Sequence, residues 1–274
     1  MTARLDELTA HALRPMRFGG ERRRALFLEP GDVHAAEHLR RAADGGAVVA
    51  YGFADAGEAD ARFAQLGLES LGDVPLVVRP LRLSGRGVLS KVPLVAPFGR
   101  SRRTGFREIA VKEPRITRLW DRFSIDVGVS VERVASWFEG RVFDRIAADG
   151  YRVFIFEDGD RYAIRAMCIF KVRSEPAGRF GYVMELLHDR SVTGLRAASH
   201  LLGLAVREMS DAGAEAARAL SFSHSGSYPI YARHAFLSSR AGMQLGVRAL
   251  DPALEDLVTA RDRWYLSYLD LESL

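Results

Sequence analysis

The stretch "SYPIYARHAF", residues 227–236, decides how the fold of this chain is assigned. It follows an apolar segment typical of a strand, and it predicts a short helix that carries two aromatic side chains, Tyr231 and Phe236. Residues five apart on a helix can both reach a sheet beneath it, so both rings can be core side chains. The alternative is that the Tyr231 hydroxyl takes part in chemistry, and the surrounding sequence bears on that choice.

The segments around this stretch predict alternating strands and helices. Apolar runs indicate strands at 107–111, 151–158, 162–172, 180–188, 217–222 and 243–250, and helical periodicity indicates helices within 116–124 and 130–148 and at 194–211. Asp158-Gly159 is a hairpin turn signal between two of these strands. The second half of the chain is therefore a mixed α/β series, and the quoted stretch is its last helix.

The first half repeats the order of that series. It predicts strands at 24–30, 47–53 and 73–83 and helices at 32–44 and 57–68. Three short sequence matches lie at corresponding elements of the two halves: "HAAEHL" (34–39) with "RAASHL" (196–201), "FAQLGL" (63–68) with "YARHAF" (231–236), and "VRPL" (78–81) with "VRAL" (247–250). Their common order indicates a tandem duplication.

A linker divides the chain between the two halves. Residues 86–106 are rich in glycine, proline and arginine and show no sustained periodicity. We therefore expect a partial unit at 1–85, the linker at 86–106 and a complete unit at 107–274.

Composition bounds the class of protein. A chain of 274 residues that is 48% hydrophobic and 27% charged is globular, and because it has no apolar run of signal or membrane-span length we expect a cytoplasmic protein. The basic runs "ERRR" (21–24) and "GRSRRTGFR" (99–107) lack interleaved aromatic residues, so we expect no nucleic-acid partner. The single cysteine, Cys168, lies in a predicted strand and is interpreted as a buried thiol.

The helix with its aromatic-x-x-x-small-Phe pattern, placed after this series, resembles the GNAT superfamily of acyl-CoA-dependent N-acyltransferases. In that family the stretch usually reads Tyr-x-x-x-Gly-Phe, which here corresponds to Tyr231, Ala235 and Phe236. The phrases "LWDRF" (119–123), "VERVASWFEGR" (131–141), "GDVPLVVRPL" (72–81) and "WYLSYLD" (264–270) are similar to a bacterial group with two GNAT units in each chain. Residues 107–274 would be a whole unit, and 25–83 would be the later part of another, beginning near its fourth strand.

The resemblance implies a site and a reaction. In the family the fourth and fifth strands splay apart, and the pantetheine of acetyl-CoA or another acyl-CoA pairs with the fourth strand, here Leu186, Leu187 and His188. An amine of a small molecule or peptide attacks the thioester, strand amides polarise the carbonyl, and the tyrosine, here Tyr231, protonates the leaving thiolate. No metal is implied. The first half has Phe63 at the tyrosine's station and is not expected to catalyse this step.

Two residues are candidates for the catalytic base. Glu185 lies in an apolar strand, by strand alternation on the face opposite Tyr182, Met184 and Leu186, and family members often carry a glutamate on this strand. An ion pair with a nearby arginine is the alternative role for Glu185. His224, just after the strand at 217–222, is the second candidate.

The phosphate-binding loop departs from the family pattern Gln/Arg-x-x-Gly-x-Gly/Ala. The corresponding stretch is "TGLRAA" (193–198), in which Arg196 replaces the first glycine and Ala198 conforms. The residues that would bind coenzyme A (CoA) through this loop are Arg190, Gly194, Arg196 and Ala198. Because of this departure two other functions stay open: a catalytically silent GNAT-fold binding module, and aminoacyl or peptidyl transfer to a cell-wall precursor.

Overall fold

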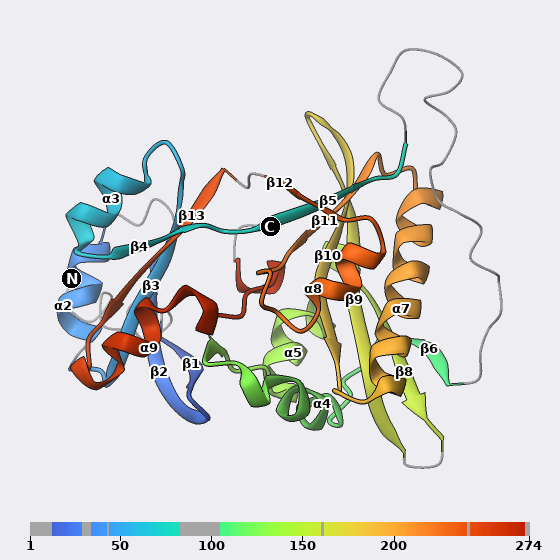
Figure 1. The fold of residues 1–274 in the computed structure, drawn as a ribbon, viewed down its shortest axis with the longest axis horizontal. Helices are drawn as coiled ribbons and strands as arrows, with labels where there is room; N and C mark the ends of the chain where they lie inside the picture. Colours follow the sequence, from blue (N-terminus) through green and yellow to red (C-terminus); the bar gives the residue numbers. More distant parts are fainter. Residues whose placement is uncertain are drawn as a thin grey trace. The chain divides into compact units, whose positions relative to one another are not determined.

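The computed structural model describes residues 13–28, 34–42, 44–82, 105–159, 162–239 and 242–271. The chain forms two compact units, each assembled from separate segments. The first unit comprises 1–75, 126–132 and 240–265, and the second comprises 76–125, 133–239 and 266–274. Figure 1 labels the elements of both units along the chain.

The first unit is a six-stranded mixed sheet in the order β4-β13-β3-β2-β1-β7. Only β2 and β3 are parallel. The helices α2 (Ala35–Ala42) and α3 (Ala59–Leu66) lie beside each other (Figure 1), and their apolar residues share one core with residues of β2 and β3. The strands are β1 (Leu13–Phe18), β2 (Glu21–Leu28), β3 (Ala47–Asp55), β4 (Glu69–Asp73), β7 (Val129–Val131) and β13 (Met243–Ala249), and α9 (Glu255–Thr259) follows β13.

The second unit is a seven-stranded mixed sheet in the order β12-β5-β11-β10-β9-β8-β6, in which only β10 and β11 are parallel. Its strands are β5 (Leu76–Pro80), β6 (Phe106–Ile109), β8 (Arg152–Asp158), β9 (Ala163–Glu175), β10 (Gly178–His188), β11 (Ala216–Leu220) and β12 (Leu237–Ser239). Its helices are α4 (Ile116–Phe123), α5 (Ala135–Arg141), α6 (Ile146–Asp149), α7 (Val192–Asp211) and α8 (Tyr228–Arg233), with short 3-10 turns η2 (Ser124–Asp126), η3 (Phe143–Arg145) and η6 (Tyr268–Asp270).

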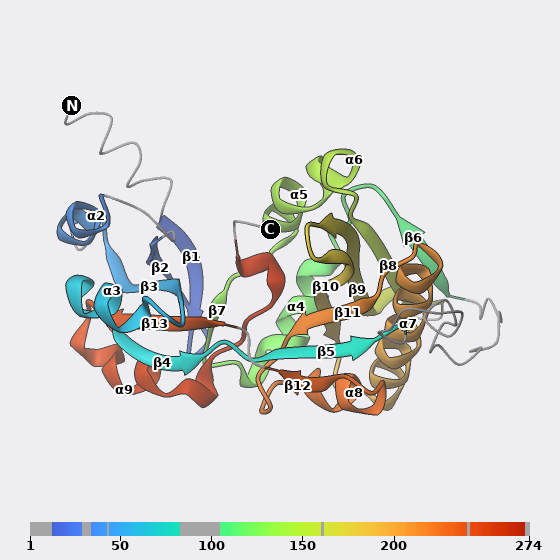
Figure 2. The same ribbon diagram turned by 90° about the horizontal axis from the view of Figure 1, so that it is seen from above.

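Helices cover both faces of the second sheet. The longest helix, α7, packs on β8, β9 and β10, and α4 packs on β9 and β10 from the other side (Figure 2). The main core lies under α7, where its small and apolar residues meet the alternate residues of the central strands, among them Cys168, Val183 and Leu186. In the described ranges, no helix has the length and apolarity to span a membrane.

The two units share one plan and exchange a strand. In each, two antiparallel strands lead through a helix to a parallel strand, then through a second helix to an edge strand; β9, β10, α7, β11, α8 and β12 correspond to β1, β2, α2, β3, α3 and β4. The strand beside the edge strand comes from the other half of the chain. Thus β5 pairs with β11 and β12 in the second sheet, and β13 pairs with β3 and β4 in the first.

This exchange corrects the domain boundaries expected from sequence. The segments at 1–85 and 107–274 are not separate units, because β5 completes the second sheet and β13 and β7 complete the first. Sequence patterns show that both strands exist but do not show which strand each one pairs with. The expected linker lies outside the described residues except for its last two, of which Phe106 begins β6.

Three strands of the first unit were not expected from sequence. β1 contains a proline and two arginines among its six residues, β4 has the sequence "ESLGD", and β7 is only three residues long. Each is therefore short or polar for a strand. Because β1 precedes β2, the first unit begins one strand earlier than its resemblance to the family indicates.

Candidate functional site

The central feature of the second unit is a strand that loses its neighbour. β10 pairs with β11 from Phe180 to Val183, where Val183 stands opposite Ala219. β11 ends one residue later, at Leu220, whereas β10 continues to His188. Residues 185–188 are therefore paired with β9, and none of residues 184–188 is paired with β11; we call this side of β10, from 184 to 188, the unpaired edge.

The first unit has no corresponding unpaired edge in its described part. There β2 pairs with β3 as far as Leu28, its last residue, opposite Gly52. The two strands approach so closely that a Cβ on Gly52 would lie 2.7 Å from the Leu28 carbonyl oxygen. Phe63, at the station of Tyr231, is a buried core side chain.

A bulge lies at the start of the unpaired edge. The register of β10 against β9 shifts between Val183 and Glu185, so Met184 is the extra residue. The bulge reverses the alternation on which the sequence-based assignment of faces rested. Val183 and Leu186 share the core under α7, whereas Tyr182 and Glu185 both contact the segment around η6, so Glu185 lies on the same face as Tyr182.

Glu185 is held in a buried ion network. Its Oε2 accepts hydrogen bonds from Arg133 Nε at 2.6 Å and from Ser267 Oγ at 3.0 Å. Arg133 also donates to Asp270 Oδ2 at 2.6 Å, and the side chains of Arg133, Glu185 and Asp270 are 0% exposed. The guanidinium lies 4.9 Å from the ring centroid of Trp120. The ion pair that the sequence left open is therefore present, and protonating Glu185 would leave the Arg133 charge less compensated.

Tyr231 is buried in the core under α7. Its ring packs at 5.3 Å from Phe236 in the core under α7, and it is 3% exposed. Burial is the main cause that raises the pKa of the Tyr231 phenol well above its ordinary value, and Cys168, Glu185 and Tyr268 add to the rise. Tyr231 shares this core with Val183 and Leu186 of β10, and Ser227, one turn before it, donates to the Leu186 carbonyl, so Tyr231 lies near the region where β10 and β11 separate. The phenol keeps its proton at neutral pH.

The chain's own groups occupy the polar atoms of the unpaired edge. The Leu186 amide donates to Glu185 Oε1 at 3.2 Å, and the Leu186 carbonyl accepts a hydrogen bond from Ser227 Oγ at 2.7 Å. At the end of the strand, His188 Nε2 lies 3.2 Å from the Gly226 carbonyl oxygen. The loop between β11 and α8 is thus tied to β10 where the resemblance places an acyl-CoA.

The N-terminus of α7 is also occupied. Ser191 caps the helix by accepting from the Gly194 amide at 2.9 Å, and the Asp189 carboxylate accepts from the Ser191 amide at 3.1 Å. Asp189 pairs with Arg165 at 2.7 Å and is 4% exposed. A Cβ on Gly194 would lie 2.1 Å from Asp189 Oδ1, so this glycine makes room for a carboxylate of the chain itself. An internal anion stands where a phosphate would bind.

The remaining candidate residues are scattered. Ala198 is fully buried in the core, and Leu187 is 0% exposed, whereas Arg190 and Arg196 are exposed. His224 is exposed and stacks on Phe222 with ring centroids 5.1 Å apart. The structure therefore brings Tyr231, Glu185, Leu186 and His188 to the unpaired edge, but it does not gather the expected phosphate-binding residues there.

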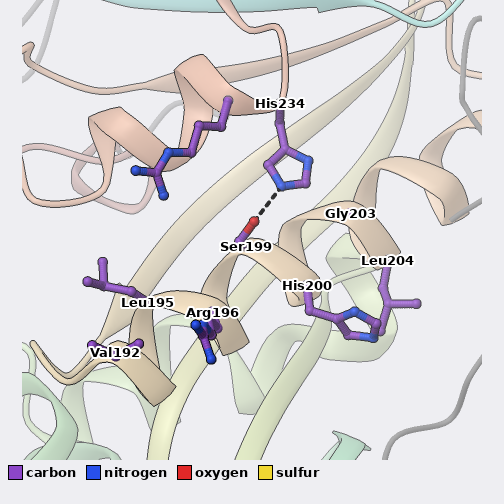
Figure 3. Close-up of a pocket in the computed structure, with 9 residues that line it drawn as sticks. Val192, Leu195, Arg196, Ser199, His200, Gly203, Leu204 and His234 are labelled. Atoms are coloured by element: carbon purple, nitrogen blue, oxygen red, sulfur yellow. Dashed lines mark hydrogen bonds between the residues drawn. The ribbon is translucent and has the colours of Figure 1, made fainter.

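A pocket of about 550 Å³ lies between α7 and α8 (Figure 3). Val192, Leu195 and Arg196 line it from the first turns of α7, and His234 faces them from the end of α8. His234 Nε2 lies 2.9 Å from Ser199 Oγ. Burial first, and the charge of Arg79 second, lower the pKa of His234 to about 4, so its ring is neutral at pH 7.

Three residues of this region were missed in the sequence. Arg133, Ser227 and Asp189 hold Glu185, Leu186 and the α7 cap respectively. Ser191, three residues before Gly194, is a recognisable N-cap signal. Arg133 and Glu132 are the two charges of the otherwise mostly apolar segment "VERVASWF", which indicates charges that need partners, but no pattern identifies Glu185 and Asp270 as the partners of Arg133.

Neither a protein-family model nor a curated protein matches this sequence. Solved structures do match. N-myristoyltransferase from Saccharomyces cerevisiae with bound myristoyl-CoA matches over 86% of this chain and 64% of its own, at a TM-score of 0.56 and 13% identity. A probable N-acyltransferase from Enterococcus faecalis V583 matches over 87% and 57%, at 0.52 and 11%. A GCN5-related N-acetyltransferase from Anabaena variabilis matches over 86% and 58%, at 0.53 and 11%.

These likenesses show the fold. The chain has the mixed α/β fold of GNAT-type N-acyltransferases, which confirms the fold class predicted from the sequence. The chain spans about three fifths of the length of these solved structures.

Proposed function

We propose that this chain is an N-acyltransferase that transfers an acyl group from an acyl-CoA thioester to the amine of a small molecule or peptide. The observation that carries the proposal is the unpaired edge of β10, with its bulge at Met184 and the protonated phenol of Tyr231 beside it. An extended pantetheine chain can add to such an edge as a strand does.

The proposed reaction assigns one role to each group at this edge. The amine nitrogen attacks the thioester carbonyl carbon, the new C–N bond forms, the C–S bond breaks, and Tyr231 donates its proton to the leaving thiolate. The Leu186 amide is the donor available to polarise the carbonyl once it exchanges its contact with Glu185. Because Glu185 is paired with Arg133, we assign it to positioning, and the amine proton leaves to water or to His224.

The internal contacts of the unpaired edge weaken donor binding without preventing it. Displacing the Ser227 hydroxyl from the Leu186 carbonyl exchanges one neutral hydrogen bond for another, and such a bond contributes about 0.5 to 1.5 kcal/mol net. A donor that forms several backbone bonds along residues 184–188 offsets this cost. The Asp189 carboxylate is the larger obstacle, since it excludes a phosphate from the α7 N-terminus.

A second candidate function is a catalytically silent binding module. The observation that favours it is the combined closure by Asp189, Ser227 and His188, which leaves the edge and the helix N-terminus both satisfied. In that case the separation of β10 and β11 is a feature of the fold, and no acyl-CoA binds there.

Calorimetric titration with acetyl-CoA distinguishes the two functions. The proposal predicts 1:1 binding, and it predicts that Ser227→Ala binds about 2- to 12-fold more tightly because the Leu186 carbonyl is released. Ser223→Ala is the matched control, since Ser223 is an exposed residue of the same loop, and its affinity should equal that of the parent. Failure of both the parent and Ser227→Ala to bind at millimolar acetyl-CoA would establish the silent module.

A further inference from the structure

The second unit buries a lysine that the proposed reaction does not use. Lys171 lies in β9 opposite Tyr182 of β10, so these two side chains share one face of the sheet. Phe170, the preceding residue of β9, belongs to the core under α7, so Lys171 lies on the other face. Of the 39 lysine and arginine residues of the chain, only Lys91, Lys112 and Lys171 are lysines. A lysine can lose its proton and become a nucleophile, which an arginine cannot do.

The stem of Lys171 is enclosed, while its ammonium group reaches the surface. The residue is 5% exposed, and Nζ lies 4.7 Å from the ring centroid of Tyr151, which is also buried. Within the described part of the chain the ammonium makes no hydrogen bond or ion pair, and Nζ is not among the fully enclosed polar atoms that lack a partner. Nζ therefore meets water at the end of a mostly buried side chain.

The charges that act on Lys171 are mostly positive. They come from Arg141 at the end of α5, Arg145 of η3 and Arg173 of β9. Asp149 of α6 opposes them, and this carboxylate pairs with Arg145 at 2.7 Å. Burial is the main cause that lowers the pKa of Lys171, and the three arginines add to the fall against Asp149. At a given pH, more of this amine is neutral and nucleophilic than the amine of an exposed lysine.

We infer that Nζ of Lys171 accepts an acyl group directly from the thioester of an acyl-CoA, with the three arginines around it attracting the phosphates of the donor. The neutral amine attacks the thioester carbonyl carbon, a C–N bond forms and the C–S bond breaks. The sulfur leaves with the electron pair of the C–S bond and takes up, through water, the proton that the nitrogen loses. The product is a neutral amide, which burial and the neighbouring arginines do not disfavour. This modification goes beyond the proposed acyl transfer, because it needs neither Tyr231 nor an added amine.

Incubation of the whole chain with acetyl-CoA, followed by mass spectrometry of its peptides, tests the inference. At pH 8 Lys171 should be acetylated at least about 5-fold faster than Lys112, because desolvation beside other cations activates a lysine amine. Lys112 is the matched comparison, since its side chain is 51% exposed and pairs with Glu139. In urea that unfolds the chain, the two lysines should react at similar rates, because the folded surroundings of Lys171 are then lost.

A second thioester tests the role of the arginines. S-acetyl-N-acetylcysteamine has the same reactive group as acetyl-CoA but no phosphates. At equal concentration it should acetylate Lys171 at least about 3-fold more slowly than acetyl-CoA does, because a cluster of cations concentrates a polyanionic donor. Equal rates with the two thioesters would overturn the role assigned to the arginines.

Tyr231→Phe separates this modification from acyl transfer at the unpaired edge. Lys171 of this variant should be acetylated at the rate of the parent, whether or not the parent acetylates any added amine. Loss of Lys171 acetylation in Tyr231→Phe would overturn the inference, since the acyl group would then come from the unpaired edge. A Lys171 that reacts no faster than Lys112 in the folded parent would overturn it as well.

Discussion

Three candidate catalytic side chains, Tyr231, Glu185 and His224, differ in what their surroundings allow. Tyr231 is buried with its proton retained, Glu185 is fixed between Arg133 and Ser267, and His224 is exposed on the following loop. The sequence proposes all three as candidates from residue type and place in the series, and their catalytic roles stay predictions. It could not assign the role of Glu185, since this depends on Arg133, which is 52 residues away in the chain.

Arg133→Met should destabilise the chain strongly. The substitution leaves Glu185 and Asp270, both fully buried, without their shared cation, and breaking such a pair costs about 3 to 5 kcal/mol. Urea unfolding measures the loss. Arg118→Met, which removes an exposed arginine, should change the free energy of unfolding by less than about 0.5 kcal/mol.

A double-mutant cycle shows whether Glu185 is the partner that matters. Arg133→Met combined with Glu185→Gln should be less destabilised than the sum of the single substitutions, with a coupling of about 1 to 3 kcal/mol. Additive single effects would mean that Glu185 does not depend on Arg133, and a catalytic role for its carboxylate would return.

His234 should make the stability of the second unit depend on pH. Its pKa falls from 6.5 to about 4 in the folded chain, because burial and then the charge of Arg79 disfavour the protonated ring. Above pH 6.5 the ring is neutral in both states, so this contribution to stability is fully present there. As the pH falls from 6.5 to 4, only the unfolded chain gains the proton, and up to about 3 kcal/mol is lost.

Urea unfolding at pH 7, 6, 5 and 4.5 checks this dependence by comparing the parent with His234→Asn. The groups around the ring are Arg79 from β5, Ser199, Arg196 and His200 from α7, and Arg233 from its own helix. Titrations shared by both chains cancel in the difference. A parent and variant with parallel pH profiles would show that His234 titrates normally.

At the scale of elements, most helices and strands follow from the sequence, but their pairing does not. The periodicity of α7 and the apolar runs of β8, β9 and β10 identify those elements to within a few residues. The bulge at Met184 left no signal in the apolar run "YVMELL", so alternation placed Glu185 on the wrong face. The exchange of β5 and β13 was also hidden, because two similar strands can complete either sheet with similar side chains.

The strand exchange predicts that neither half of the chain folds alone. Fragment 91–274 lacks β5, which pairs with both β11 and β12, and fragment 1–90 lacks β13, which pairs with both β3 and β4. Each fragment exposes unpaired strand edges and should aggregate or melt without cooperativity. Expressed together, the two fragments should copurify in a 1:1 ratio and melt cooperatively.

Size-exclusion chromatography with light scattering measures the mass, and calorimetry the cooperativity of melting, of the separate fragments and of the coexpressed pair. Cutting the chain after residue 90 leaves every described strand intact, so a failure of the separate fragments cannot be attributed to a cleaved element. A monomeric 91–274 fragment that melts as cooperatively as the whole chain would contradict the exchange.

Across the whole molecule, the two units share one topology but differ where the central parallel pair of strands ends. The second unit has an unpaired edge and Tyr231, whereas the described part of the first unit keeps β2 and β3 paired and has Phe63 at that station. Phe63 packs so tightly that a Cβ on Gly246 of β13 would lie 2.6 Å from its ring. We therefore expect acyl transfer from the second unit only.

The rate of thiol release from acetyl-CoA, measured with a panel of small amines and N-terminal peptides, tests acyl transfer most directly. We expect amine-dependent release by the parent and a rate about 10²- to 10⁴-fold lower in Tyr231→Phe, whose melting temperature should stay close to that of the parent. Phe63→Tyr should create no new activity. Amine-dependent release by Tyr231→Phe at the parent's rate would contradict the role of Tyr231. The absence of release with every amine, together with a lack of acetyl-CoA binding, would contradict acyl transfer itself.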